Sequence, residues 1–328
     1  KKVQENYSRR FSIRFPNEEL PAGRPLRTTP IYDRLLAAGA QMGEAYGLEQ
    51  ALWFAPEGIV DDFSWRRSTD FEHVAEEAKA VRNAVGMMEI SSFAKYTIRG
   101  LGAPDWLDHL LACRLPVEGR MTLAPMLNHA GKLIGDFSLA NLGDGEYFIA
   151  GSGLAENYHM RWFTQNLPDD GSVDIIARGA GLVGLSIAGP KSRELLQRLV
   201  DEDVGKQAFR FLDIRKLDVG MAPCLIGRVS FTGDLGYEIW MEPEYQRYVF
   251  DLIQSQGQDL DLRLFGSRAL NSLRVEKNFG SWAREYRPVY GPYEAGMGRF
   301  VALKKEADFI GKAGAAAEKE NGGKLQLR

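Results

Sequence analysis

The chain has 328 residues and a formal net charge of −3, because 41 lysines and arginines face 44 aspartates and glutamates; this balance argues against nucleic-acid binding through a basic excess. A hydrophobic content of 45% together with 35 glycines excludes a disordered, collagenous or coiled-coil protein, and the length suggests about two domains. Two cysteines exclude a disulfide scaffold and a cysteine-rich metal site, and no apolar run approaches the length of a membrane span, so we expect no membrane partner.

The first 60 residues are predicted to form an irregular lead-in arm. Proline and glycine interrupt the segment FPNEELPAGRPLRTTP, and the aromatic pair Trp53 and Phe54 is followed by another proline. One helix is expected at residues 30–39, where Pro30 stands at a plausible first position and Gly39 at the end. We expect most of this arm to pack on the surface of the protein.

A first α+β unit is predicted at residues 61–170. From Asp70 onward, apolar residues recur at spacings of three and four and indicate an amphipathic helix that ends at Gly86. Alternating and apolar runs bounded by turn residues then indicate several short strands with helices on one side. The further elements expected in this unit are strands at 93–99, 121–128, 133–142 and 147–150, and helices at 103–115 and 156–166.

A second α+β unit of similar build is predicted at residues 171–312. The turn Gly189-Pro190 separates a strand from a helix, and the segment TGDLG separates two further strands. The composition of residues 313–328 is that of a weakly structured tail. The elements expected in the second unit are strands at 182–187, 224–230 and 238–241, and helices at 191–199, 244–256 and 267–277.

Familiar catalytic motifs are missing from the sequence. The four histidines are scattered and none stands in the HExxH spacing of a zinc protease helix. There is also no GxSxG, GxxxxGK[ST] or strand-linked GxGxxG segment, which removes the usual support for a serine hydrolase, a phosphate-loop enzyme or a dinucleotide-binding domain. The remaining candidates for chemistry are carboxylates and aromatic residues beside glycines.

Asp136 is the first candidate. It follows Gly135 in the segment MLNHAGKLIGDFSL, where strand alternation points it to one face. In a partly desolvated cleft this carboxylate would have a raised pKa or be held charged by donors, and would serve as an acid, a base or an anchor for a cation. The alternative is a strand-end aspartate that binds turn amides, and spacing leaves both interpretations open.

Two further segments combine polar and aromatic residues. In FTGDLGYE, the glycines let a flat ligand approach the backbone, and Glu238 can accept two hydrogen bonds from an amino-pyrimidone edge; a β-turn with a surface glutamate is the alternative. In LRVEKNFGSWAREYRP, Trp282 and Tyr286 can stack on a heteroaromatic ring while a basic side chain meets carboxylates. Equally, Arg274 and Glu276 would form a buried pair, with Trp282 in the core.

The order of these segments resembles the folate-dependent aminomethyltransferase family, the T-protein of the glycine cleavage system. It resembles more closely the folate-binding half of dimethylglycine and sarcosine dehydrogenases, because plain T-proteins lack the first two of the resembling stretches. These stretches are spread along nearly the whole chain, from Phe15 to Lys312, and are FPNEELPAGRP, GAQMGEAYGLEQALWFAP, SSFAKY, MLNHAGKLIGDFSL, SIAGPKSRELLQRL, RVSFTGDLGYEIW, SLRVEKNFGSW and DFIGK.

The resemblance implies a fold of two related ferredoxin-like α+β units, with a closing jelly-roll-like domain that begins at residues 313–328 and is otherwise missing. It implies transfer of a one-carbon unit from an iminium, derived from an N-methyl amine, to tetrahydrofolate, which yields 5,10-methylenetetrahydrofolate. FAD is then expected on a covalently linked N-terminal flavin domain outside this chain, which opens on Lys1 and reads as a fragment or processed form. The expected compartment is the bacterial cytoplasm or the mitochondrial matrix.

The resemblance also assigns site residues. Asp136 matches the family's catalytic carboxylate and Glu238 the glutamate that holds the pterin ring, whereas Leu123 and Phe231 stand where T-proteins have tyrosines. Leu270 stands where the family has an arginine, and Arg268 lies two residues earlier. The residues expected to contact the folate are Glu238, Phe231, Leu123, Tyr237, Arg274, Arg268, Trp282 and Tyr286, with Lys277 as a further cation for its carboxylate tail.

Two other functions remain open from the sequence. A folate-dependent O- or S-demethylase of the same family needs no flavin partner, although the dehydrogenase-like opening of the chain counts against it. A non-catalytic regulatory subunit that resembles dimethylglycine dehydrogenase is favoured by Leu123 and Phe231 and disfavoured by the retained Asp136.

Overall fold

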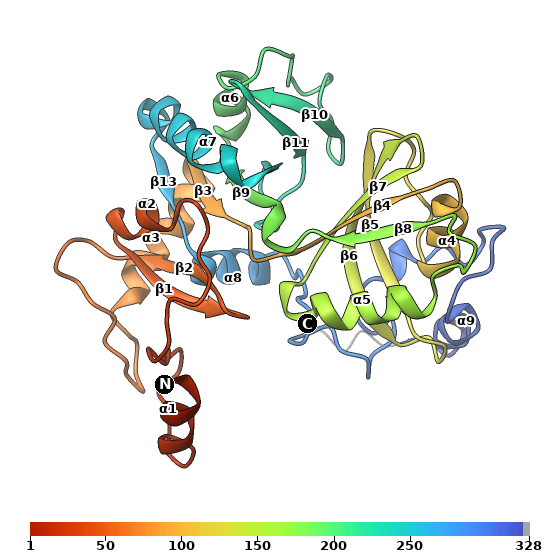
Figure 1. Cartoon of the computed structure of the whole chain (residues 1–328), viewed down its shortest axis with the longest axis horizontal. Helices are drawn as coiled ribbons and strands as arrows, with labels where there is room; N and C mark the ends of the chain where they lie inside the picture. The colour runs from red at the N-terminus through yellow and green to blue at the C-terminus, as the bar shows by residue number, and fades with distance from the viewer. Residues whose placement is uncertain (324–328) are drawn as a thin grey trace.

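Two β-sheets covered by helices form the body of the computed structural model, which describes residues 1–323 (Figure 1). The larger sheet has the strand order β10-β11-β12-β9-β3-β13, and the smaller one the order β5-β6-β7-β4-β8. All neighbouring strands run antiparallel except β3 and β13, which are parallel. The mixture of sheets and covering helices confirms the predicted α+β class.

The six-stranded sheet owes its core to strand alternation. In β12 (Gly236–Met241), Tyr237, Ile239 and Met241 lie in one hydrophobic cluster, whereas Glu238 and Trp240 point to the other face. The other strands are β3 (Val85–Glu89), β9 (Val183–Ala188), β10 (Ile214–Val219), β11 (Ala222–Gly227) and β13 (Leu262–Leu264). The helices of this half are α3 (Asp70–Asn83), α6 (Ser192–Gln197), α7 (Pro243–Gln256) and α8 (Ser267–Glu276).

The five-stranded sheet packs its apolar face against helices in the same way. In β6 (Leu133–Gly143), Phe137 and Leu139 lie in a core cluster with Phe163 of α5 (Glu156–Gln165), and alternation turns Asp136 and Ser138 to the opposite face. The other strands are β4 (Ala94–Arg99), β5 (Arg120–Leu127), β7 (Glu146–Gly151) and β8 (Asp174–Ala177). Helices α4 (Ala103–Leu110) and α9 (Lys312–Glu320) complete this half.

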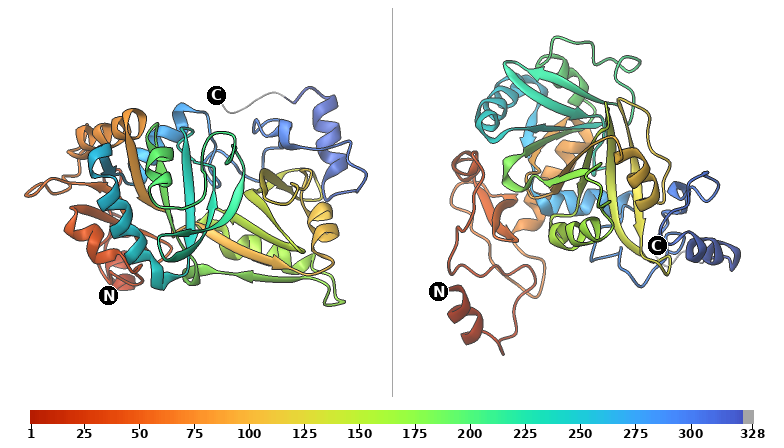
Figure 2. Two further views of the ribbon diagram at one scale, coloured as in Figure 1. Left: turned by 90° about the horizontal axis from the view of Figure 1, so that it is seen from above. Right: turned by 45° about the vertical axis from the view of Figure 1, so that its right-hand side comes forward.

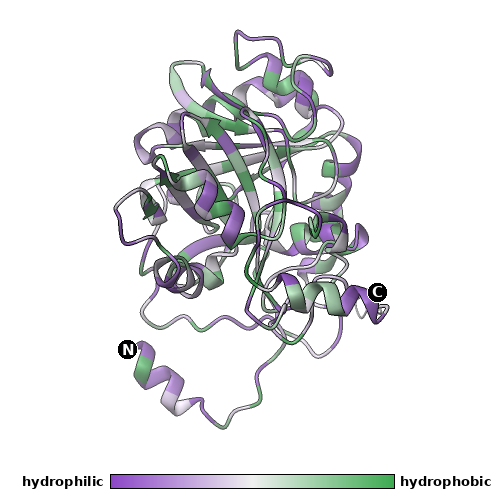
Figure 3. Cartoon of the chain, turned by 90° about the vertical axis from the view of Figure 1, so that its right-hand side faces the viewer, coloured by the Kyte–Doolittle hydropathy of each residue, from purple (hydrophilic) through white to green (hydrophobic). Residues whose placement is uncertain are grey.

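The lead-in arm is more regular than the sequence indicated. It contains α1 (Lys2–Ser8), α2 (Tyr32–Ala37) and a hairpin of β1 (Ala40–Ala45) and β2 (Leu48–Phe54). Tyr46 and Gly47 both have positive φ angles, 54° and 84°, as a two-residue hairpin turn requires. A hydrogen bond attaches the hairpin to α3, because the backbone N–H of Phe54 donates to the buried carboxyl group of Glu77. Helix α1, by contrast, stands away from the body and buries no side chain (Figure 3).

Each sheet combines strands from both sides of the boundary predicted at residue 170. Strand β3, which was not expected, lies inside the six-stranded sheet, and β8 pairs with β4 of the other sheet. All five residues of β3 are buried, so it lacks the alternation that reveals a strand in a sequence. Each sheet therefore depends on chain from both predicted units.

The C-terminal tail also differs from expectation as far as it is described. Helix α9 packs closely on the turn before β6, where a Cβ at Gly131 would lie 2.6 Å from the Gly314 carbonyl carbon. Helix α9 and the arm lie at opposite ends of the molecule (Figure 2). The prediction for residues 324–328 falls outside the described residues. Within residues 1–323, no helix has both the length and the apolar composition needed to cross a bilayer.

Candidate functional site

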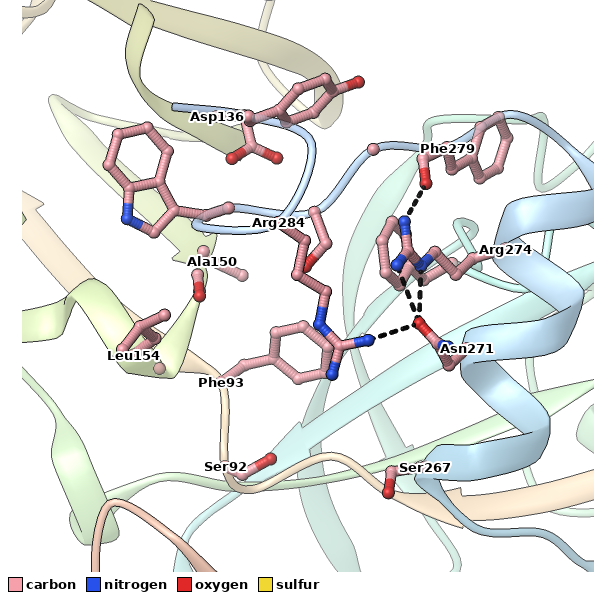
Figure 4. Close-up of a pocket in the computed structure, with 18 of the residues that line it drawn as sticks. Ser92, Phe93, Asp136, Ala150, Leu154, Ser267, Asn271, Arg274, Phe279 and Arg284 are labelled. Atoms are coloured by element: carbon pink, nitrogen blue, oxygen red, sulfur yellow. Dashed lines mark hydrogen bonds between the residues drawn. The ribbon is translucent and has the colours of Figure 1, made fainter. Parts of the chain in front are cut away.

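A cavity of about 2080 Å³ lies where the two sheets face each other. Its walls come from β6 and β12, from helix α8 with the loop that follows it, and from the lead-in arm around residues 14–20 and 44–52. Figure 4 shows the part of this cavity that Asp136 faces. Side chains distant in the sequence therefore meet in one space.

Asp136 enters the cavity from the middle of β6. It pairs in register with Pro125 of β5, and its side chain makes no hydrogen bond to another residue within 1–323. Burial, offset only by a backbone hydrogen bond, raises the pKa of this carboxyl to about 7. Asp136 is thus able to hold or release a proton near neutral pH, which turn-binding aspartates do not do.

Glu238 enters the same cavity from β12. Its neighbours on the adjacent strands are Gly227 and Ser186, and the sulfur of Met121 lies 2.8 Å from the position that a Cβ of Gly227 would take. No hydrogen bond from a described residue reaches this side chain, and burial raises its pKa to about 7. The structure thus supports the prediction that Asp136 and Glu238 line one cavity.

Aromatic rings form the walls near Asp136. The ring of Trp282 stacks on Tyr158, with centroids 5.8 Å apart and planes 29° apart, so it belongs both to the core and to the cavity wall. The Tyr286 hydroxyl donates to the Met297 sulfur at 3.4 Å. Burial, and then the charge of Asp136, raise the pKa of Tyr286 to about 12, so the phenol stays protonated.

Phe231 and Leu123 are also part of the wall. The ring of Phe231 lies roughly parallel to that of Phe279, with centroids 6.3 Å apart, and Leu123 lies in β5 opposite Ser138. The two residues that replace family tyrosines are therefore at the cavity. They make its surface apolar at the two positions where T-proteins have tyrosines.

The basic residues expected to bind a carboxylate tail already have acidic partners. Arg268 pairs with Asp61 at 3.0 Å and with Asp70 at 2.8 Å. Lys277 lies 3.5 Å from a carboxylate oxygen of Asp234. All of these residues except Asp61 line the cavity, but the charges of Arg268 and Lys277 are largely neutralised there.

Arg274 is a structural residue. Its guanidinium donates to Asn271 through Nε and Nη2 and, through Nη1, to the Phe279 carbonyl and to Glu285 at 2.7 Å. Its side chain is almost fully buried. The buried pair with Glu276 that the sequence suggested does not form, because Glu276 turns outward and pairs with Arg82.

Tyr237 is not brought into the cavity. As the neighbour of Glu238 in a strand, it points to the opposite face of the sheet and is fully buried beside Phe209, with ring centroids 5.7 Å apart. Its hydroxyl accepts a hydrogen bond from Arg193 at 3.3 Å. The prediction that it contacts the ligand therefore conflicts with the strand geometry.

Asn271, Arg284, Phe93 and Phe279 line the cavity and were not assigned to the site from the sequence. The segment SWAREY did contain a signal for Arg284, since it alternates the two wall aromatics with a charged residue. Asn271 and Phe93 have no comparable signal. Among residues 1–323, no group of three histidine, cysteine or carboxylate side chains is arranged to hold a metal ion.

Comparisons with known proteins agree with the resemblance seen in the sequence. Residues 31–305 match the family described as GCVT N-terminal domain, and residues 1–29 match the family described as FAD dependent oxidoreductase central domain. The chain is 34% identical to dimethylglycine dehydrogenase, mitochondrial, of Mus musculus over 99% of its own length, but spans only 38% of that protein. It is 30% identical to an aminomethyltransferase of Caldanaerobacter subterraneus subsp. tengcongensis, across 82% of this chain and 72% of the relative.

Among solved structures, the fold resembles glycine cleavage system aminomethyltransferase T from Bartonella henselae. The TM-score is 0.75 at 19% identity, and the match covers 90% of this chain and 75% of that one. At this identity the likeness establishes the fold. The T-protein-like arrangement of the two sheets expected from the sequence is confirmed.

Proposed function

Since the chain belongs to the GCVT N-terminal domain family, a folate-binding family of aminomethyltransferase type, we propose that it transfers a one-carbon unit to tetrahydrofolate. We propose further that it is the folate-side part of an enzyme like dimethylglycine or sarcosine dehydrogenase. The identity of 34% with the mouse dehydrogenase over almost the whole chain supports this assignment.

The observation that carries the proposal is the convergence of Asp136 and Glu238. They come from different sheets, line one cavity, and have no hydrogen-bond partner among residues 1–323. A desolvated carboxyl group without a hydrogen-bond donor lowers the stability of the folded protein. The presence of two such groups in one cavity is explained best by a ligand that supplies donors or positive charge.

The cavity fits a flat, donor-rich heterocycle such as the pterin ring of a folate. Glu238 lines the cavity and accepts two hydrogen bonds from an amino-pyrimidone edge. Trp282 and Phe231 supply ring faces for packing. The missing hydroxyl at Phe231 concerns one hydrogen bond of about 1 kcal/mol, which does not abolish binding.

Asp136 carries the chemical role. When bound, tetrahydrofolate supplies the amine that accepts the one-carbon unit, and the product is 5,10-methylenetetrahydrofolate. The ionised Asp136 stabilises the positive charge of an iminium. Because its pKa lies at about 7, the same carboxyl takes up a proton from a reacting amine and passes it on at neutral pH.

Oxidation of the N-methyl amine is assigned to a flavin domain outside this chain. The match of residues 1–29 to an FAD dependent oxidoreductase domain supports this division of labour. The choice among dimethylglycine, sarcosine and other N-methyl amines would then be made at the flavin. A mitochondrial matrix or bacterial cytoplasmic setting suits the two buried free cysteines.

The test is a titration of the chain with tetrahydrofolate, combined with the rate of 5,10-methylenetetrahydrofolate formation from formaldehyde. We expect saturable binding to the wild type, weakened binding in Glu238→Gln, and near-normal binding with a reduced rate in Asp136→Asn. The matched control is Asp218→Asn, which removes an exposed aspartate of β10 outside the cavity. Absence of saturable binding to the wild type would contradict the proposal and favour a regulatory role.

A further inference from the structure

Arg284 is one of the cations of this cavity that have no salt bridge among residues 1–323; Arg14, Arg228 and Arg299 are the others. The other basic side chains discussed above each face a carboxylate: Arg268 faces Asp61 and Asp70, Arg274 faces Glu285, and Lys277 faces Asp234. Arg284 has no acidic partner among residues 1–323, and its guanidinium makes one hydrogen bond, from Nη1 to Asn271 Oδ1 at 3.0 Å. Most of its donors therefore remain free to meet an anion.

The single hydrogen bond belongs to a rigid platform. Asn271 Oδ1 also accepts from Nε and Nη2 of the buried Arg274, at 3.1 and 2.8 Å. Arg274 in turn fixes Glu285 and the Phe279 carbonyl, which flank the segment that carries Arg284. The guanidinium of Arg284 is thus joined to this network by its hydrogen bond to Asn271, although the residue itself is exposed.

Backbone geometry aims the side chain into the cavity. Ala283 has a φ of 65°, and its N–H donates to the Tyr286 carbonyl at 2.8 Å, so Arg284 lies inside a tight turn of the chain. Figure 4 shows the guanidinium between Phe93 and Asn271, with the carboxylate of Asp136 pointing into the same space. A positive group and a negative group thus face one chamber.

We propose that Arg284, held by Asn271, is the carboxylate-binding position of this cavity. Arginine is suited to this role because its fork of donors matches a carboxylate bidentately. Given the proposed function on which this inference rests, the carboxylate has two sources: the glutamate of the folate, or the acid group of an iminium derived from an N-methyl amino acid. In the second case Asp136 and Arg284 together would select a substrate with a cationic and an anionic end.

The folate arm of the experiment compares the binding of tetrahydrofolate with that of tetrahydropteroate, which lacks the glutamate. If the glutamate is the source, Arg284→Gln weakens tetrahydrofolate binding by about tenfold to hundredfold and leaves tetrahydropteroate binding unchanged, since one charged pair is lost. Arg284→Lys keeps the charge without the fork and should lose part of that factor.

The amine arm uses two stable cations as probes of the iminium: glycine betaine, which carries a carboxylate, and tetramethylammonium, which does not. If the amine is the source, Arg284→Gln weakens glycine betaine binding by a similar factor and leaves tetramethylammonium binding unchanged. Asn271→Asp, which keeps the acceptor for Arg274 but adds a charge that neutralises Arg284, should reproduce the loss while the protein stays folded.

Arg287→Gln is the matched control, because Arg287 follows closely in the chain but does not line the cavity. If Arg284→Gln changes neither tetrahydrofolate nor glycine betaine binding relative to this control, the inference is wrong. If the wild-type chain binds neither tetrahydrofolate nor tetrahydropteroate, the proposed function is contradicted. The binding of glycine betaine to the wild type and to Arg284→Gln then still decides the role of Arg284.

Discussion

Asp136 and Glu238 are held where burial disfavours their charge, and nothing among residues 1–323 compensates for it through a hydrogen bond from a neighbouring side chain. An unpartnered carboxyl in the native protein binds its proton more tightly than the same group in the unfolded chain. The two acids therefore act against stability at neutral and alkaline pH. Carboxyl groups with a raised pKa and no protein partner are typical of ligand-binding and catalytic sites.

Glu238→Gln should stabilise the protein while it weakens folate binding. The ordinary pKa of a glutamate, 4.5, is raised to about 7 here, so the destabilisation grows from about pH 4.5 and is complete above about pH 7. The amide has the same shape and no charge. Thermal unfolding should give a higher melting temperature for the variant at pH 8 and an equal one at pH 4.5; a lower value at pH 8 would refute the assignment.

His159 has the opposite dependence on pH. It is fully buried behind β6, where its Nε2 donates to the Ile134 carbonyl at 3.0 Å and its ring packs on Phe137 and Trp282. Burial lowers the pKa of His159 to about 4. Between about pH 6.5 and pH 4 this histidine is therefore protonated in the unfolded chain and neutral in the native protein. Stability is lost as pH falls from about 6.5 to 4.

His159→Gln tests this dependence, since the amide of glutamine retains a donor for Ile134 and does not titrate. The variant should be less stable than the wild type at pH 7, because the ring contacts are lost. The difference in unfolding free energy between the two proteins should shrink between pH 7 and pH 4.5 in urea denaturation. A constant difference over that range would show that the histidine does not titrate differently in the two states.

Among the elements, helix α8 and the loop that follows it supply a large part of the cavity wall. The loop carries Trp282, Arg284 and Tyr286 into the cavity, and Arg274 of the helix holds the loop through two hydrogen bonds, one to the Phe279 carbonyl and one to Glu285. Arg274 itself lines the cavity and at the same time holds the loop in place. Its contact with the folate stays a prediction.

Arg274→Met should destabilise the protein by about 3–5 kcal/mol, because it leaves Asn271, Glu285 and the Phe279 carbonyl without their partner. Urea denaturation measures this loss, with Arg161→Met, at an exposed position of α5, as the matched control. A loss below about 1 kcal/mol would mean that water replaces these hydrogen bonds and that the loop is held by other contacts.

Most elements could be predicted from local patterns, and the exceptions share a cause. The helices at α3, α7 and α8 and the strands at β5, β6 and β9 were expected within a few residues of their observed bounds. Strand β3 is buried on both faces and β13 has only three residues, so neither shows an alternation to detect. The β1–β2 hairpin was missed because its turn residues, Tyr46 and Gly47, are not a common hairpin pair.

At the scale of the whole molecule, the site depends on how the parts close around the cavity. The two sheets supply the acids, the α8 loop supplies the aromatic wall and Arg284, and the arm completes the rim. The C-terminal helix α9 is attached to the five-stranded half by glycines that meet without side chains, at Gly131 and Gly314. These contacts let the backbone segments pack directly on each other.

Gly314→Ala should therefore loosen the docking of α9. The new methyl group would overlap the Ala130 carbonyl, and we expect a loss of about 1–3 kcal/mol together with faster hydrogen exchange in residues 312–320. Gly181→Ala is the control, because a side chain at that position meets no atom within 4 Å. Equal exchange in both variants would show that α9 is anchored elsewhere.

The sequence by itself determined the α+β class, the bounds of most elements, and that Asp136 points to one face of its strand, because these follow from the backbone periods of strands and helices. Only the tertiary structure decided that the two acids share a cavity, that Tyr237 faces away from it, and that Arg274 is bound while Arg284 is available. The physical reason is that local periods are properties of a segment. Ion pairs and sheet neighbours are chosen by packing between segments far apart in the chain, which no local pattern encodes.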